Sequence, residues 1–241
     1  MTTLPLKSGS RRKESLVRDQ ILLEAKRLFR ERGYAAVSIN DIIERVGVTK
    51  PTLYHYFSDK ESLFTDVLQE VMRSGSVFVN EQEHLKGRSI AEQLIVLAAG
   101  FIHYSPTSIA TLLRDASEHL SAEHQAVVQK ANQEFMIQPI AALLRPALQE
   151  GVIGLPLAAE KTALSRVEIT QCWEEQANIL AVLFISYLDA FTVWYRYGGA
   201  TCLPLQPTVS LPQELQQPAI PAAVYQQACQ LVTFWLNGLQ K

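Results

Sequence analysis

In the first sixty residues, apolar side chains recur at helical spacing in short runs. Single turn residues, such as Gly33 and Gly47, separate these runs. From Ser15 to Arg32, apolar side chains recur every three or four positions, with charged residues on the other positions. This spacing predicts an amphipathic helix, which Gly33 ends. A shorter run with the same spacing follows from about Ile39 to Val46, and Gly47 closes it after two turns. The sequence therefore predicts two helices joined by a tight connection.

Polar residues mark where the next helices begin. Ser38, followed three residues later by Asp41, resembles a capping box for the second helix. Thr49 can cap a third helix, and Pro51 then falls in its first turn, where the backbone N–H has no partner within the helix anyway. Ser58 and Glu61 form an S-x-x-E box that predicts a fourth helix from about Asp59 to Val79. The proline thus belongs to a helix start.

The aromatic run in residues 48–64, VTKPTLYHYFSDKESLF, divides between two sides of the third helix. Leu53 and Phe57 are four residues apart and share one face, which we expect to pack inward. Tyr54, His55 and Tyr56 fall on the other sides, and the pattern is too wide for one buried stripe. The alternative is that the whole aromatic run is core. We predict that these three residues face outward.

The remaining chain repeats the helical pattern and shows no sustained alternation of period two. Helices are expected at about 89–104, 106–120, 121–150, 157–170, 173–197 and 222–239. Pro139 and Pro146 should bend the 121–150 helix, and the five prolines of residues 200–221 predict a long loop. The fold class is therefore all-α.

Charge is distributed unevenly along the 241 residues. Residues 1–60 hold twelve Lys and Arg against seven Asp and Glu, a net charge of +5, whereas residues 61–241 carry −7. A basic segment attached to an acidic body is typical of a chain that meets a polyanion through that segment only. The basic residues 1–13 are interpreted as a flexible arm.

Three further features narrow the possibilities. Three scattered cysteines give neither a zinc-ligand spacing nor a disulfide framework, and no metal or cofactor is predicted. The N-terminus lacks the apolar core of a signal peptide. Residues 177–195 are long and apolar enough to span a bilayer, but Asn178 and Asp189 favour a buried helix of a soluble, cytoplasmic protein. Glycine-rich phosphate loops and nucleophile motifs are missing, so an enzyme is not expected.

Two short helices joined by a turn with glycine form a helix-turn-helix, whose second helix fits the DNA major groove. The surrounding residues resemble the DNA-binding domain of TetR-type (tetracycline-repressor-like) transcriptional regulators. The resemblance covers about fifty N-terminal residues and rests on the pattern L-Y-x-Y-F-x-x-K-E-x-L, present here as Leu53, Tyr54, Tyr56, Phe57, Lys60, Glu61 and Leu63. Pro51 and Ile43 depart from the commonest residues of the family, glycine and alanine.

The resemblance implies a bacterial homodimer that binds double-stranded, near-palindromic operator DNA, usually as a repressor that an unknown small molecule releases. An activator, or a helical adaptor without DNA binding, stays open as an alternative. The expected domains are a helix-turn-helix domain over 14–60 and an effector-binding and dimerisation domain over 61–241.

The resemblance also implies the DNA contacts. These are Ser38 and Asn40 at the second helix, Thr49, Lys50, Pro51, Thr52, Tyr54, His55 and Tyr56 in the third, and Lys60. We expect Lys50, Thr52 and His55 to approach base edges. Tyr54, Tyr56 and Lys60 would fix phosphates, and Ser38 would donate from its helix start. Arg11, Arg12 and Lys13 would add contacts from the arm or serve only solubility.

In this family the last two long helices form a four-helix dimer bundle. Candidates for the interface here are Leu183, Tyr187, Phe191, Trp194, Leu231, Phe234 and Trp235. An effector pocket is predicted among Phe101, His103, Tyr104, Leu113, Phe135, Met136, Trp173 and Tyr187, although plain core packing is the commoner explanation for each of them. Arg114, Asp115 and Glu118 share a helix face that suits either a polar effector or plain solvent.

Overall fold

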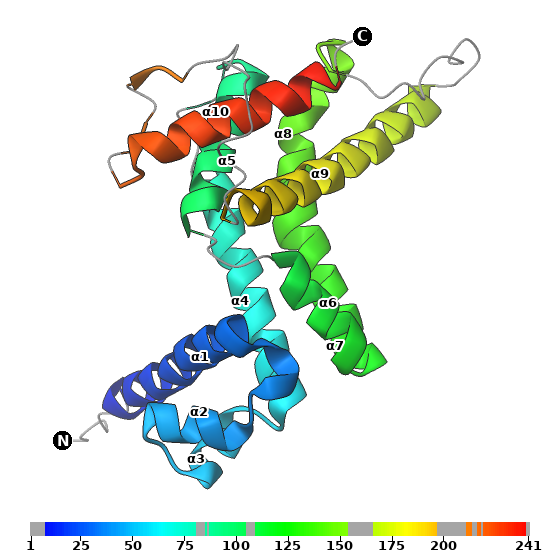
Figure 1. Ribbon diagram of the computed structural model, residues 1–241. Helices are drawn as coiled ribbons and strands as arrows, with labels where there is room; N and C mark the ends of the chain where they lie inside the picture. Colours follow the sequence, from blue (N-terminus) through cyan, green and yellow to red (C-terminus); the bar gives the residue numbers. More distant parts are fainter. Residues whose placement is uncertain are drawn as a thin grey trace, which may run out of the picture. The chain divides into compact units, whose positions relative to one another are not determined.

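The computed structural model describes residues 8–80, 85, 87–104, 109–153, 166–196, 211–213, 216–217 and 219–239. Every regular element in these ranges is a helix, which confirms the all-α prediction (Figure 1). The chain forms two compact units. The first contains Met1–Val71 and Thr111–Lys130, and the second contains Met72–Ala110 and Ala131–Lys241. The predicted division at residue 60 stays a prediction, and the first unit extends beyond it.

Helix α1 (Ser8–Ala36) opens the first unit. Its backbone leaves helical geometry at Gly33, with φ 77° and ψ 166°, so the helix of the sequence pattern ends where predicted. A residue with a Cβ would be strained at this φ. The beginning differs from expectation, because residues 8–13 of the predicted arm are helical. Residues 1–7 and the side chains of Arg11, Arg12 and Lys13 lie outside the described part of the chain.

Helix α2 (Ile39–Val46) begins and ends at the predicted residues, and helix α3 (Lys50–Tyr56) begins just after Thr49, as predicted. Ser38 and Asp41 form the reciprocal capping box, and Gly47 ends α2 in the left-handed conformation with φ 75°. Thr49 accepts a hydrogen bond from the backbone N–H of Thr52, with the proline in the first turn. Because both caps are local, the short helices are delimited by their own sequence.

The start of helix α4 (Lys60–Asn80) corrects one prediction. The Asp59 side chain, not Ser58, accepts the backbone N–H of Ser62 at 2.7 Å. Ser58 instead donates its hydroxyl to Asp59. Glu61, the expected partner in the box, accepts the backbone N–H of Ser121 at 2.8 Å. The S-x-x-E pattern was right about where the helix starts and wrong about which residues cap it.

The core of the first unit is formed by the inward faces of these helices. Its least exposed members come from α1, α2, α3 and the first half of α4: Ile21, Ala25, Phe29, Ile42, Leu53, Phe57, Leu63, Phe64, Val67 and Leu68. Phe29 and Phe64 pack edge to face with ring centroids 4.9 Å apart. Burying each such side chain contributes about 1.5–3 kcal/mol. Leu53 and Phe57, the two residues predicted to pack inward, are both among them.

The second unit contains helix α5 (Ile90–Tyr104) and most of the remaining chain. Helix α6 (Ile109–His119) and helix α7 (Ala122–Asn132) come next in the chain, and both cross the boundary between the two units. The expected helix 121–150 is interrupted by a π-helical turn, η2 (Gln133–Ile137), before helix α8 (Gln138–Gln149). The Gln138 N–H bonds to Gln133 O, five residues back. This wider turn lies just before Pro139, whose ring would crowd the carbonyl of a regular helix.

Helix α9 (Arg166–Arg196) and helix α10 (Ala222–Asn237) complete the second unit. One side of α9 is buried through Ala177, Leu180, Ala181, Phe184 and Leu188. Among the described residues, Gln171–Trp194 is long and apolar enough to cross a membrane, and 44% of its most apolar window is buried within the chain. Most of the loop predicted for 200–221 and most of the weak helix predicted for 157–170 lie outside the described residues.

The capping of α4 is testable by a pair of substitutions. Asp59→Ala removes the acceptor for the Ser62 N–H and should lower the free energy of unfolding by about 0.5–2 kcal/mol. Ser58→Ala is the matched control and should change it by less than about 0.5 kcal/mol. Urea unfolding measures both, and a larger loss in Ser58→Ala than in Asp59→Ala would restore the original interpretation.

Candidate nucleic-acid interface

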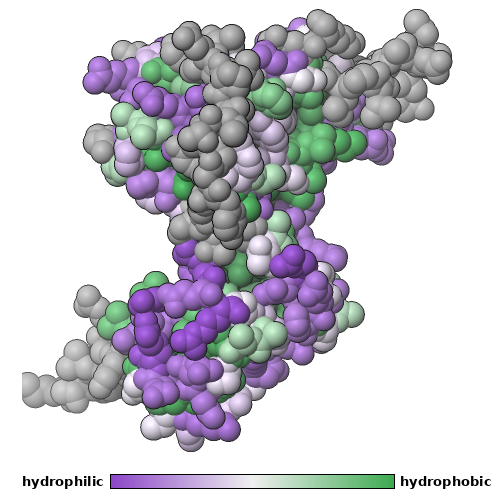
Figure 2. Space-filling view, viewed as in Figure 1, coloured by the Kyte–Doolittle hydropathy of each residue, from purple (hydrophilic) through white to green (hydrophobic). Residues whose placement is uncertain are grey.

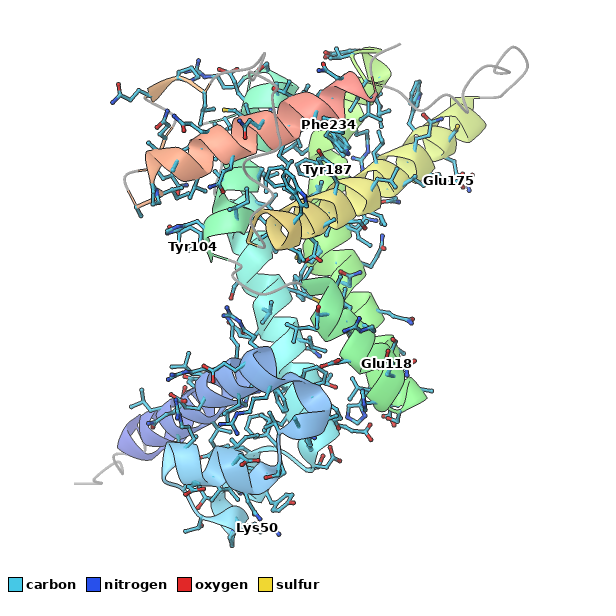
Figure 3. All side chains as sticks on the ribbon, viewed as in Figure 1. Lys50, Tyr104, Glu118, Glu175, Tyr187 and Phe234 are labelled. Atoms are coloured by element: carbon cyan, nitrogen blue, oxygen red, sulfur yellow. The ribbon has the colours of Figure 1, made fainter. Side chains whose placement is uncertain are left out.

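Helix α3 presents two chemically different sides. Leu53 and Phe57 are 0% and 1% exposed, whereas Tyr54 is 42% exposed. Lys50, Pro51 and His55 are exposed as well, and Figure 3 shows Lys50 at the outer end of α3. The predicted split between an inward apolar side and an outward polar side is therefore present. The outward side of α3 is therefore exposed along the length of the helix and can contact a ligand along that length.

Two of the outward residues are held by neighbouring rings. The Lys50 ammonium lies 6.0 Å from the centroid of the Tyr54 ring. The rings of His55 and Tyr56 meet edge to face at 5.0 Å, and Tyr56 is half-buried. These contacts restrict the side chains, which favours a preformed surface.

The hydroxyl groups predicted to contact a ligand already have partners at the helix starts. Thr52 and Thr49 share a hydroxyl–hydroxyl hydrogen bond of 2.8 Å. Ser38 donates its hydroxyl to Asp41, and this bond holds the pKa of the Asp41 carboxyl below its usual value. Ser38 and Thr52 must therefore exchange or share a hydrogen bond to contact a ligand, whereas exposed Asn40 makes no such demand.

Lys60 lies at the start of α4 and makes a contact that the sequence did not predict. Its ammonium is 4.0 Å from the centroid of the Tyr34 ring. The pKa of Lys60 lies below its usual value, because partial burial lowers it by more than the neighbouring Asp41 carboxylate raises it. Asp41 belongs to the capping box of α2, so Lys60 and the start of α2 lie in the same neighbourhood.

Arg18 of α1 connects the same group of helices from another side. Its guanidinium pairs with Asp66 of α4 at 2.6 Å and lies 5.4 Å from the centroid of the Phe57 ring, just after α3. Because Arg18 is partly exposed, its ion pair with Asp66 adds little to the free energy of unfolding. We attribute to Arg18 instead the orientation of α1 against α4 and the end of α3. The periodicity of α1 alone gave no signal for this role.

Part of α6 and α7 belongs to the first unit and contacts its other helices directly. Asp115 accepts the backbone N–H of Tyr34 at 2.8 Å. The Glu61 carboxylate that accepts the Ser121 N–H also lies 3.5 Å from the ring of His124. Asp115, one of the three residues considered for a polar effector, thus already accepts a hydrogen bond within the first unit. Arg114 and Glu118 are exposed and 3.9 Å apart.

The predicted effector-pocket residues do not all fall in one unit. Leu113 belongs to the first unit, and the other seven belong to the second. Tyr104 is 55% exposed and its ring meets that of His103 edge to face. The Arg73 guanidinium lies 5.4 Å from the centroid of the Phe135 ring, whereas Met136 is buried. Phe101, Trp173 and Tyr187 are half-buried against the core. The pocket stays a prediction.

The predicted dimer-interface residues separate into two groups. Phe191, Leu231 and Trp235 are at most 8% exposed, so the structure places them in the core of their own chain. Leu183, Trp194 and Phe234 are 38–52% exposed, and Tyr187 stacks on Phe234 with centroids 6.1 Å apart (Figure 3). Ile179 and Val182, which the sequence analysis missed, add to the exposed apolar side of α9. Their spacing with Leu183, at i, i+3 and i+4, was the available signal.

Comparison with known proteins identifies a family for the N-terminal part of the chain. Residues 21–67 match the family model described as bacterial regulatory proteins, tetR family. The chain is 45% identical over 65 residues to the transcriptional activator FasR of Mycolicibacterium smegmatis, covering 25% of this chain and 30% of FasR. It is 29% identical over 130 residues to the transcriptional repressor KstR2 of Rhodococcus jostii, covering 49% of this chain and 59% of KstR2. The chain thus spans less than two thirds of either relative.

The fold as a whole is shared with a solved structure. FadR from Bacillus subtilis, in complex with stearoyl-CoA, superimposes with a TM-score of 0.60 over 92% of this chain and 98% of FadR. The sequence identity is 15%, so this likeness shows the fold alone.

Proposed function

Because residues 21–67 place this chain among the transcriptional regulators of the TetR family, we propose that it is a repressor that binds a near-palindromic operator as a homodimer. A small molecule that binds the second unit releases it. The supporting observation is the divided surface of α3, with Leu53 and Phe57 buried and Lys50, Tyr54 and His55 exposed. This is the arrangement that a helix needs to lie in a major groove while its own domain holds it.

Charge and dimensions support duplex DNA as the ligand. The net charge of +5 in residues 1–60 attracts a polyanion, whereas the rest of the chain is acidic. The major groove is about 12 Å wide and admits one α-helix with its side chains. Lys50 and His55 supply donors for base edges, and the phenols of Tyr54 and Tyr56 supply donors for phosphate oxygens.

The exposed apolar side of α9 and α10 supports the homodimer. Ile179, Val182 and Leu183 are 44–47% exposed and share one side of α9, and Phe234 of α10 is 52% exposed. Figure 2 shows hydrophobic surface in the region of α9. A contiguous apolar surface of this kind marks an interaction site, and a second copy offers the same surface in a two-fold arrangement.

The relatives leave two regulatory outcomes to compare. KstR2 is named a repressor and FasR an activator, so the activator is the second candidate function for this chain. That FadR was solved with stearoyl-CoA supports a small-molecule effector in the second unit without identifying it. The proposed location of the protein is the cytoplasm, where operator DNA, a second copy of the chain and a small molecule can all reach it.

The direct test is selection of genomic fragments by the purified protein at low and then physiological salt, followed by transcription from the enriched promoter. A repressor lowers the transcript level and an activator raises it. If no fragment is enriched at low salt, the protein is not a DNA-binding regulator and the helical adaptor is favoured.

The exposed residues of α3 should separate into two kinds when substituted. Lys50→Ala and His55→Ala should each reduce discrimination between the operator and single-base variants by about 1–3 kcal/mol. Tyr54→Phe should weaken binding to all sequences equally, because a phosphate contact carries no base information. Fluorescence anisotropy with the selected operator and its variants measures both effects. Unchanged affinity and specificity in all three would move the contact surface away from α3.

The homodimer should depend on the exposed side of α9 and α10. Leu183→Glu and Phe234→Glu each place a carboxylate in the proposed interface and should give a monomer by light scattering, with loss of operator affinity. Val152→Glu, at a residue that is 51% exposed elsewhere in the second unit, is the matched control and should stay dimeric. A dimer in all three variants would place the interface elsewhere. The operator half-sites should lie about 34–36 Å apart, or a multiple of this.

A further inference from the structure

The contact between Lys60 and Tyr34 connects a proposed DNA contact to a buried ring. Tyr34 is 8% exposed and its ring lies close to those of Phe29, Phe64 and His119, with centroids 4.8–5.9 Å apart. The Lys60 ammonium, 4.0 Å from the centroid of the same ring, is within the distance of a cation–π interaction. A rigid buried ring thus holds the end of a flexible side chain.

The position of Tyr34 is itself fixed from a distant part of the chain. Gly33, with φ 77°, turns the backbone out of α1, and the Tyr34 N–H then points away from the helix. Asp115 of α6 accepts this N–H at 2.8 Å. A Cβ on residue 33 would lie 3.4 Å from the same carboxylate, so the approach is close. One carboxylate of α6 therefore anchors the backbone at Tyr34.

We propose that Tyr34 is a positioning residue for the phosphate contact of Lys60, and that Asp115 holds Tyr34 in place for this purpose. The inference rests on the DNA-binding function proposed above. It assigns to the segment 111–130 a part in forming the DNA-binding surface, in addition to completing the fold of the first unit.

The physical reason is the conformational entropy of lysine. A free lysine side chain loses up to about 2 kcal/mol of rotamer entropy when it is ordered on a ligand. In this protein the order is already established on folding, because the ring attracts the ammonium. An ammonium over a ring face keeps N–H groups directed away from the ring, and these can donate to a phosphate oxygen. The Asp41 carboxylate is near enough to Lys60 to raise its pKa against the effect of burial.

The competing explanation is that Tyr34 only fills the core, and that Lys60 covers it by chance. Truncating the ring would unfold the unit under either explanation, so the test must keep the shape of the ring. Tyr34→Phe retains an electron-rich face, whereas 4-cyanophenylalanine at the same position has a similar shape and an electron-poor face. Only the cation–π interaction distinguishes the two.

Binding of a short duplex of arbitrary sequence at low salt is the readout, because phosphate contacts do not depend on sequence. The cyano variant should bind roughly two- to five-fold more weakly than Tyr34→Phe. Lys60→Met should weaken binding and reduce the slope of log K against log salt by about 0.9. In the Lys60→Met background, the two ring variants should bind equally. Equal binding with Lys60 present, or a difference that persists in Lys60→Met, would overturn the proposal.

Asp115 is tested in the same assay. Asp115→Ala removes the acceptor of the Tyr34 N–H and should weaken duplex binding only when Lys60 is present. Glu118→Ala removes an equal charge from an exposed position of the same helix and is the control. Loss of a carboxylate by itself strengthens attraction to DNA, so net charge predicts tighter binding for both variants. A loss in Glu118→Ala as large as in Asp115→Ala would show that the loss does not depend on the Tyr34 N–H and would overturn the role of Asp115.

A measurement without DNA separates this proposal from the proposed function. In the free protein, the ring current of Tyr34 should shift the Lys60 side-chain methylene protons upfield, and Asp115→Ala should reduce the shift. If the shift is present and no duplex binds the native protein, the DNA-binding function fails and the contact has another purpose. If duplex binds and the shift is missing, Tyr34 does not position Lys60.

Discussion

The first unit depends on one aromatic cluster, formed by Phe29, Tyr34 and Phe64. Phe29 belongs to α1 and Phe64 to α4, and their edge-to-face contact joins the two helices. Tyr34 follows the break at Gly33 and lies against both rings. The short helices α2 and α3 have two turns each, too few to be stable alone. They therefore need the surface that α1 and α4 provide.

Once this surface exists, the two sides of α3 acquire separate tasks. Leu53 and Phe57 attach the helix to the core, and this leaves Lys50, Tyr54 and His55 exposed. The same division recurs in the second unit, where Leu180, Phe184 and Leu188 bury one side of α9 while Ile179, Val182 and Leu183 stay exposed. In both units the buried side explains stability, and the exposed side carries the proposed interaction.

The features that the sequence predicted correctly are those that depend on residues close together in the chain. Helix starts and ends were found wherever one residue decides them, as with Ser38, Gly47 and Thr49, because capping involves neighbours in the chain. The box at Ser58 failed because Glu61 has a partner sixty residues away, at Ser121. The π turn before Pro139 and the cation–π contact of Lys60 were not predicted either, because neither leaves a periodic signal in the sequence.

Everything proposed for this protein depends on contact between the outward side of α3 and DNA. Hydroxyl-radical labelling of side chains, read by mass spectrometry with and without the selected operator, tests it most directly. The account predicts that DNA lowers the labelling of Tyr54, His55 and Tyr56 and leaves that of Val152 in the second unit unchanged. Unchanged labelling of Tyr54 and His55 under conditions in which the operator is bound would contradict it.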